Sequence, residues 1–244
     1  MRFEFTRLRF EITATETVCF PPGKAANKLR GAMGMSLPPE IFRPVAAEGL
    51  PSGLRDPPRP FVFRARHLDG LTFKPGEIYG FDLHVFSADT EPFVRVLGGV
   101  AHQTKMVIEI KPGAGPVNRL RVEFLSPTEL KPNSPEFPVL FGRARDRIST
   151  LRAVYGPGPL DVDFKALGAR AAEVRITTRE IVPVKIDRRS SRTGQTHSIG
   201  GFTGVVEYEG ELTGFMPYLQ AAQWTGVGRH AVWGNGEIRV SQPI

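Results

Sequence analysis

The order of expected secondary-structure elements occurs twice along the chain, and this repeat constrains the fold more than any other feature of the sequence. In the first half, alternating or apolar runs typical of strands occupy 1–13, 59–68, 77–86 and 105–110. Helical patterns lie between them at 24–37 and 92–100, which gives the order βαββαβ. The second half has the same order, with strands at 119–130, 172–186, 198–210 and 236–240 and helices at 137–156 and 212–224.

This order is that of the split βαβ, or ferredoxin-like, domain. We therefore predict an α+β fold of two tandem ferredoxin-like domains, at 1–112 and 118–244. The boundary falls in the linker 111–118, KPGAGPVN, where Pro and Gly occur without apolar periodicity. Within the first strand the apolar side changes phase between Phe5 and Leu8, and we expect a β-bulge there.

Length and composition indicate a soluble globular protein. The chain has 244 residues, 41% of them hydrophobic, which is enough for a substantial core. No apolar run approaches the roughly 20 residues of a membrane helix, and the N-terminus does not resemble a signal peptide. We expect a cytoplasmic protein with no membrane partner. The single cysteine, Cys19, cannot form an internal disulfide and is more typical of a small core residue than of a nucleophile.

The charge balance favours a polyanionic partner. Lys and Arg number 32 against 25 Asp and Glu, so the net charge is +7 and the pI is about 9.8. The densest basic segment carries Lys185, Arg188, Arg189 and Arg192, opposed only by Asp187. A second basic run, at 143–152, lies on an expected helix, where a solvated face explains it equally well.

Glycine is concentrated in 226–238, GVGRHAVWGNGEI, between the last helix and the last strand. A dinucleotide fingerprint would follow a strand, open a helix and need an acidic residue about 20 positions further on, and the printed chain has no such residue. The G-K-[ST] of a phosphate-binding loop is also missing. Glycines here would permit positive φ or the close approach of another backbone or a ligand.

Several motifs together carry a resemblance to a known family. They are the run Arg189–Arg192, the GGFTG at 200–204, the pairs Gly226–Gly228 and Gly234–Gly236, and the LRGAMG at 29–34. With these motifs the chain resembles the CRISPR repeat-processing endoribonucleases of the RAMP superfamily. About a quarter of the chain matches closely, and the middle matches only in element order.

The resemblance implies a protein that binds CRISPR repeat RNA and cleaves precursor crRNA without a metal or other cofactor. A ribose 2′-hydroxyl attacks the adjacent phosphate and leaves a cyclic phosphate. Such a cut needs a base for the hydroxyl, an acid for the leaving oxygen and positive charge at the phosphate. The alternative is a non-cleaving crRNA-binding subunit whose partners are other subunits of a CRISPR effector complex.

The sequence departs from the family pattern at the first helix. Many members carry a histidine on or just after it, whereas residues 1–66 contain none. The base comes from elsewhere, or charge and positioning do most of the work, or the RNA is held without cleavage. Because His230 lies in the glycine-rich segment and the first helix carries Lys28 and Arg30, we predict these three residues as catalytic.

We predict a larger set of RNA-binding residues, drawn from the first helix, the basic segment and the glycine-rich segment. They are Lys24, Arg188, Arg189, Arg192, His197, Gly226, Gly228, Arg229, Trp233, Gly234 and Gly236. Structural alternatives stay open for several of them. The lysines and Arg30 could form a solvated helix face, Trp233 could belong to the core, and the glycines could serve a tight crossing against the first domain.

Overall fold

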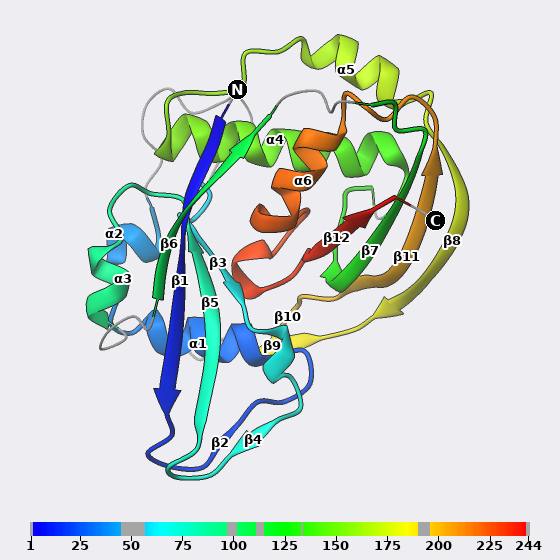
Figure 1. The fold of residues 1–244 in the computed structure, drawn as a ribbon. Helices are drawn as coiled ribbons and strands as arrows, with labels where there is room; N and C mark the ends of the chain where they lie inside the picture. The colour runs from blue at the N-terminus through cyan, green and yellow to red at the C-terminus, as the bar shows by residue number, and fades with distance from the viewer. Residues whose placement is uncertain are drawn as a thin grey trace.

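The computed structural model describes residues 2–44, 57–96, 102–110, 115–132, 134–189 and 196–242, except the side chains of 188–189 and 196–198. The chain forms two four-stranded antiparallel sheets with helices packed around them (Figure 1). In these described ranges, every helix is too short or too polar to span a bilayer.

Each half of the chain builds one sheet. The first contains β1 (Arg2–Thr13), β3 (Phe61–Arg64), β5 (Ile78–Val85) and β6 (His102–Glu109) in the order β3-β5-β1-β6. The second contains β7 (Arg119–Thr128), β8 (Arg175–Val184), β11 (Gly201–Glu209) and β12 (Ile238–Ser241) in the order β12-β7-β11-β8. In both sheets the fourth strand of the half pairs with the first, and the third lies between the first and the second. The prediction of tandem ferredoxin-like folds is confirmed.

The helices follow the predicted order with three differences. The helices are α1 (Ala25–Met33), α2 (Pro39–Phe42), α3 (Glu91–Val96), α4 (Phe137–Tyr155), α5 (Phe164–Ala171) and α6 (Met216–Thr225). The sequence analysis missed the short α2. It also missed α5, although Asp163 caps that helix by accepting a hydrogen bond from the Ala166 N–H at 2.8 Å. The last helix begins at Met216 and not at Leu212.

Short elements complete the fold. The 3₁₀ turns are η1 (Arg66–Leu68) and η2 (Ala231–Trp233), and the two-residue strands β2 (Val18–Cys19) and β4 (Thr72–Phe73) pair with each other. A small hairpin, β9 (Asp187–Arg189) with β10 (Thr196–Ser198), extends from the end of β8. The domain limits at 1–112 and 118–244 remain a prediction.

The first sheet is covered on both faces. On one face, Phe61, Phe63 and Phe81 pack with Met33 of α1 and Phe93 of α3. On the other face, apolar side chains belong to the same core as the second sheet, α4 and α6; these are Phe3, Phe5, Val62 and Phe86. The second half therefore uses the first sheet as part of its own core.

This double cover explains the change of phase in β1, and the bulge expected there is absent from the described strand. Pairing of β1 with β5 and β6 runs without a register shift from Arg2 to Thr13. Phe3 and Phe5 point to the shared core, whereas Leu8 and Phe10 point to the core under α1 and α3. Side chains alternate between faces along a strand, so Arg7 and Arg9 continue the face of Phe3 and Phe5. A two-sided strand, and not an extra residue, produces the pattern.

The second core forms on the apolar face of α4. The buried apolar residues of this helix follow helical spacing; they are Phe137, Leu140, Phe141, Ala144, Ile148 and Leu151. The ring of Phe141 lies 4.6 Å from that of Phe215, at the start of α6, in an edge-on contact. This packing places the last residues of α6 between the two sheets (Figure 1).

Candidate functional site

The glycine loop, residues 226–236, joins α6 to β12 and contacts the first domain. Gly234 and Gly236 have φ of 81° and 69°, in the left-handed region that glycine tolerates. A Cβ on Gly234 would lie 2.6 Å from Ala26 Cβ of α1, and a Cβ on Gly236 would collide with the carbonyl oxygen of Val227. The protein's own backbone and α1 thus fill the space beside these glycines.

Hydrogen bonds tie the glycine loop to the end of β7. Ser126 Oγ donates to the Gly234 carbonyl at 2.8 Å, and the Gly236 N–H donates to the Pro127 carbonyl at 3.0 Å. The Arg229 N–H donates to the Glu129 carbonyl at 3.0 Å. These bonds connect the loop to the residues at the end of β7.

His230 occupies the middle of the loop with φ of 63°, the single positive φ outside glycine in the described residues. Its ring stacks on Trp233, with centroids 4.5 Å apart and an interplanar angle of 5°. Its Nε2 lies 3.4 Å from Glu129 Oε2, and Arg229 Nη1 lies 3.1 Å from the other carboxylate oxygen. Glu129 therefore contacts both Arg229 and the imidazole of His230.

Trp233 links the glycine loop to α1. The guanidinium carbon of Arg30 lies 5.2 Å from the Trp233 ring centroid and 4.5 Å from that of Phe42. Arg30 is buried, so it does not belong to a solvated helix face. Trp233 is partly buried and packs against the first core, which Val232 enters. The indole of Trp233 thus contacts both the His230 ring and the Arg30 guanidinium.

Lys28 takes a different direction from Arg30. Its Nζ donates to the Cys19 carbonyl at 2.8 Å, and the side chain is exposed. The structure therefore brings two of the three residues predicted as catalytic, His230 and Arg30, to Trp233, while Lys28 lies beside β2. Cys19 itself is exposed and not a core residue.

The basic segment lies next to the start of α1. A Cβ on Gly23 would lie 2.7 Å from Ile186 Cδ1, so the chain entering β9 touches the turn before Lys24. The register of the hairpin places His197 opposite Arg188. Arg189 is described only by its strand position, and Arg192 lies outside the described residues. Asp69, and not Lys24, closes the first turn of α1 by accepting from the Ala25 N–H at 2.9 Å.

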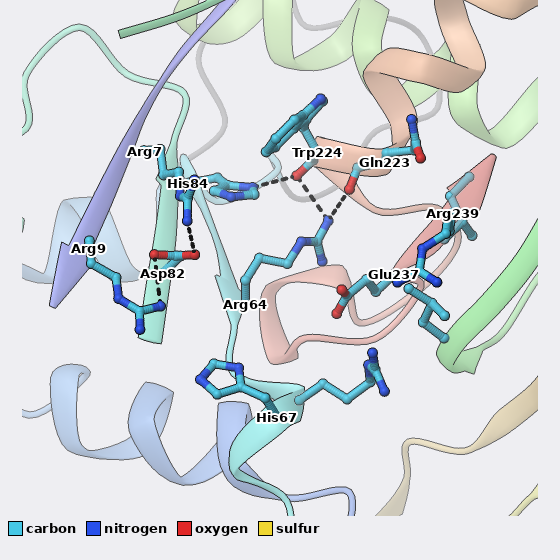
Figure 2. Close-up of a pocket in the computed structure, with 13 residues that line it drawn as sticks. Arg7, Arg9, Arg64, His67, Asp82, His84, Gln223, Trp224, Glu237 and Arg239 are labelled. Carbon is cyan, nitrogen blue, oxygen red and sulfur yellow. Dashed lines mark hydrogen bonds and ion pairs between the residues drawn. The ribbon is translucent and has the colours of Figure 1, made fainter. Parts of the chain in front are cut away.

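A cavity of about 520 Å³ lies between the two sheets (Figure 2). It is lined by five arginines, two histidines and two carboxylates together with four other residues. The charged and histidine residues are Arg7, Arg9, Arg64, Arg66, Arg239, His67, His84, Asp82 and Glu237. Arginine thus exceeds carboxylate by three charges, which suits an anionic ligand.

The charges in this inter-domain cavity are unevenly paired. Asp82 Oδ2 lies 2.8 Å from Arg7 Nη2, and Asp82 Oδ1 lies 3.4 Å from Arg9 Nη1, so this carboxylate bridges the two arginines (Figure 2). Arg64 is 9% exposed, and its Nη1 has no hydrogen-bond partner in the described part of the chain. Burial lowers the pKa of Arg64, and the Glu237 charge partly offsets that effect. The N–H groups of a guanidinium nitrogen that lacks a protein partner can donate hydrogen bonds to a phosphate oxygen.

Comparison with known proteins finds a family match in the second half of the chain. Residues 122–238, from β7 to the start of β12, match the sequence profile of the family described as CRISPR-associated endoribonuclease Cas6. Just under half of the chain is thus similar to the Cas6 family. A comparison with curated proteins finds no match.

Solved Cas6 structures share this fold at low sequence identity. Thermus thermophilus Cas6 is 15% identical, with a TM-score of 0.61 and 99% of each chain covered. The Cas6 of a product complex is 16% identical, with a TM-score of 0.59, covering 98% of this chain and 100% of its own. The Cas6 part of a partial Cas6-RT-Cas1–Cas2 complex is 10% identical with a TM-score of 0.63, over 99% of this chain and 46% of the other.

Sequence reasoning located the glycine loop but missed Glu129 beside it and two arginines of the cavity between the sheets. Glu129, the partner of Arg229 and His230, lies on an expected strand and had no motif to mark it. Arg7 and Arg9 could have been found, because they continue the face of β1 that Phe3 and Phe5 define. In the described residues, no group of three or more His, Cys, Asp or Glu side chains could hold a metal ion.

Proposed function

We propose that this chain binds CRISPR repeat RNA and cleaves precursor crRNA at one site in each repeat, without a metal. The observation that carries the proposal is the contact of the glycine loop with α1, in a chain that is similar to the Cas6 family over residues 122–238. Trp233 of the loop contacts both the His230 ring and the Arg30 guanidinium. His230 lies within the matched residues, and Arg30 lies in the LRGAMG motif of α1.

The reaction is an in-line attack within the RNA. The ribose 2′-oxygen forms a bond to the adjacent phosphorus while the bond to the 5′-oxygen of the next nucleotide breaks, which leaves a cyclic phosphate. The 2′-proton passes to a base, and an acid protonates the leaving oxygen. His230 exchanges one of these protons, and Arg30 supplies positive charge for the phosphate. Lys28, whose Nζ bonds to the Cys19 carbonyl beside β2, is a second proposed source of positive charge for the RNA.

Three basic features mark the path of the RNA. The chain entering β9 touches the turn before α1, and we propose that the basic segment and Lys24 contact the RNA near this point. The inter-domain cavity offers a second approach through its excess of arginine. Phosphate contacts of this kind supply affinity that does not depend on sequence.

The cellular setting follows from the substrate. A processing enzyme meets precursor crRNA in the cytoplasm, where we place this chain. One structural relative belongs to a Cas6-RT-Cas1–Cas2 complex, and we therefore expect other CRISPR proteins among the partners of this chain.

The test is incubation of the purified protein with its cognate repeat RNA in excess EDTA. The expected result is one cut whose upstream product ends in a cyclic phosphate, identified by mass spectrometry. RNA that is shifted on a gel but stays intact would instead support a non-cleaving crRNA-binding subunit. Cleavage that EDTA abolishes and Mg²⁺ restores would refute the metal-independent mechanism.

A further inference from the structure

Side chains from other elements form hydrogen bonds with the last carbonyls of α6. The last carbonyls of a helix have no partner within the helix. Here Arg64 Nη2 donates to the carbonyls of Gln223 and Trp224 at 2.8 and 3.0 Å, and His84 Nδ1 lies 3.0 Å from the Trp224 carbonyl (Figure 2). Arg147 Nε donates to the Thr225 carbonyl at 2.8 Å.

These donors suit a helix end by charge. The C-terminus of a helix carries a partial negative charge, which Arg64 and Arg147 oppose. Burial lowers the pKa of Arg147 to about 10, so this guanidinium stays protonated at neutral pH. Burial, and then the nearby charge of Arg64, lowers the pKa of His84 to about 3. The imidazole is therefore neutral at neutral pH, and because a carbonyl only accepts, its Nδ1 carries the proton.

The donors come from both halves of the chain. Arg64 lies on β3 and His84 on β5 of the first sheet, whereas Arg147 lies on α4 of the second half. The next residue after the closed carbonyls is Gly226, where the glycine loop begins. The loop starts at this junction and rests on the first core farther along, through Val232 and Trp233.

We infer that Arg64, His84 and Arg147, here called the helix clamp, are positioning residues that fix the glycine loop relative to α1. The inference rests on the proposed function for its effect on cleavage. The clamp holds the carbonyls of Gln223, Trp224 and Thr225, directly before Gly226, where the loop begins. A displacement of about 1 Å at a reacting group can lower a rate by about 10²-fold.

His84 and Arg147 provide the sharpest variants. His84→Leu and Arg147→Met remove a donor, while His84→Asn keeps an N–H at the position of Nδ1 and Arg147→Lys keeps the charge and a donor. Exposed residues outside the helix clamp serve as matched controls, in Arg95→Met on α3 and His102→Leu on β6. All variants are compared at a temperature where circular dichroism shows them folded.

Two measurements are made on each variant. One is the single-turnover cleavage rate at saturating protein, together with the dissociation constant for repeat RNA. The other is hydrogen exchange at the N–H groups of Val227, Arg229 and Gly236, which bond within the loop and to β7. The exchange measurement needs no cleavage, so it tests the helix clamp even if the RNA stays intact.

We expect His84→Leu and Arg147→Met to lower the rate by about 10-fold to 10²-fold, with dissociation constants within about threefold of wild type. Loop exchange should accelerate in the same variants, and His84→Asn and Arg147→Lys should restore both properties. Unchanged loop exchange in His84→Leu and Arg147→Met would overturn the inference, as would equal losses in the controls. Wild-type protein that does not cleave would refute the proposed function, and exchange alone would then decide the inference.

Discussion

The imidazole of His230 lies nearly parallel to the indole of Trp233, with ring centroids 4.5 Å apart. Aromatic contacts of this kind contribute about 0.5–1.5 kcal/mol beyond the area they bury. The stack restrains the histidine ring while one edge faces the carboxylate of Glu129. The ring that we propose as a proton carrier is therefore held in place before any RNA binds.

Replacement of His230 tests its proposed role in cleavage. Because this residue has φ of 63°, His230→Asn is preferable to alanine, since asparagine tolerates the left-handed region. Acid–base help is worth about 10²–10⁴-fold, so single-turnover cleavage should slow by that factor while the dissociation constant stays nearly unchanged. Wild-type cleavage by His230→Asn with slow cleavage by His197→Asn would move the role to the hairpin. If neither variant is slow, the arginines and lysines carry catalysis.

The basic segment should carry affinity. Replacing Arg188, Arg189 and Arg192 with alanine should weaken repeat binding and reduce the slope of log K against log salt by up to about three charges, because each phosphate contact releases counterions. The matched control replaces Arg95, Arg170 and Arg175, which pair with exposed carboxylates away from the hairpin. Equal slopes in the two triple variants would remove the segment from the interface.

Burial of His84 should make stability depend on pH. Its pKa is about 3 in the folded chain against 6.5 for the ordinary residue, so between these values the unfolded chain binds one more proton. The free energy of unfolding should therefore fall by about 1.4 kcal/mol for each pH unit below about 6.5, toward about 3. Urea unfolding at several pH values should show that the free energy of unfolding of His84→Asn depends on pH less steeply than that of wild type, by this amount. Identical slopes in wild type and His84→Asn would contradict the assignment.

Alanine at Gly236 should destabilise the fold far more than alanine at Gly76. Both glycines have positive φ, at 69° and 89°, where a Cβ costs about 1–2 kcal/mol. The space beside Gly76 is open, whereas a Cβ on Gly236 would strike the Val227 carbonyl. We expect losses of about 1 kcal/mol for Gly76→Ala and about 3 kcal/mol or more for Gly236→Ala in chemical unfolding. Similar losses of stability in the two variants would mean that the glycine loop can move to accommodate a Cβ at Gly236.

Periodicity in the sequence was sufficient to predict the two ferredoxin-like folds, because strand and helix spacing are local properties. The glycine loop was also found from local composition. The burial of Arg30 was not predictable in this way, since the rings that enclose it belong to Phe42 and to Trp233, about 200 positions away. The phase change in β1 was assigned to a bulge for a related reason. One strand contributes to two cores, and a period-two pattern cannot say which layer will cover each face.

The cover on both faces of the first sheet means that the two halves depend on each other to fold. A fragment ending near residue 110 would expose Phe3, Phe5, Val62 and Phe86 to water as one contiguous patch, and such a patch favours aggregation. Heat should accordingly melt the intact chain in one cooperative calorimetric transition, despite its repeated architecture. The two halves repeat one sheet topology, but we expect them to unfold together.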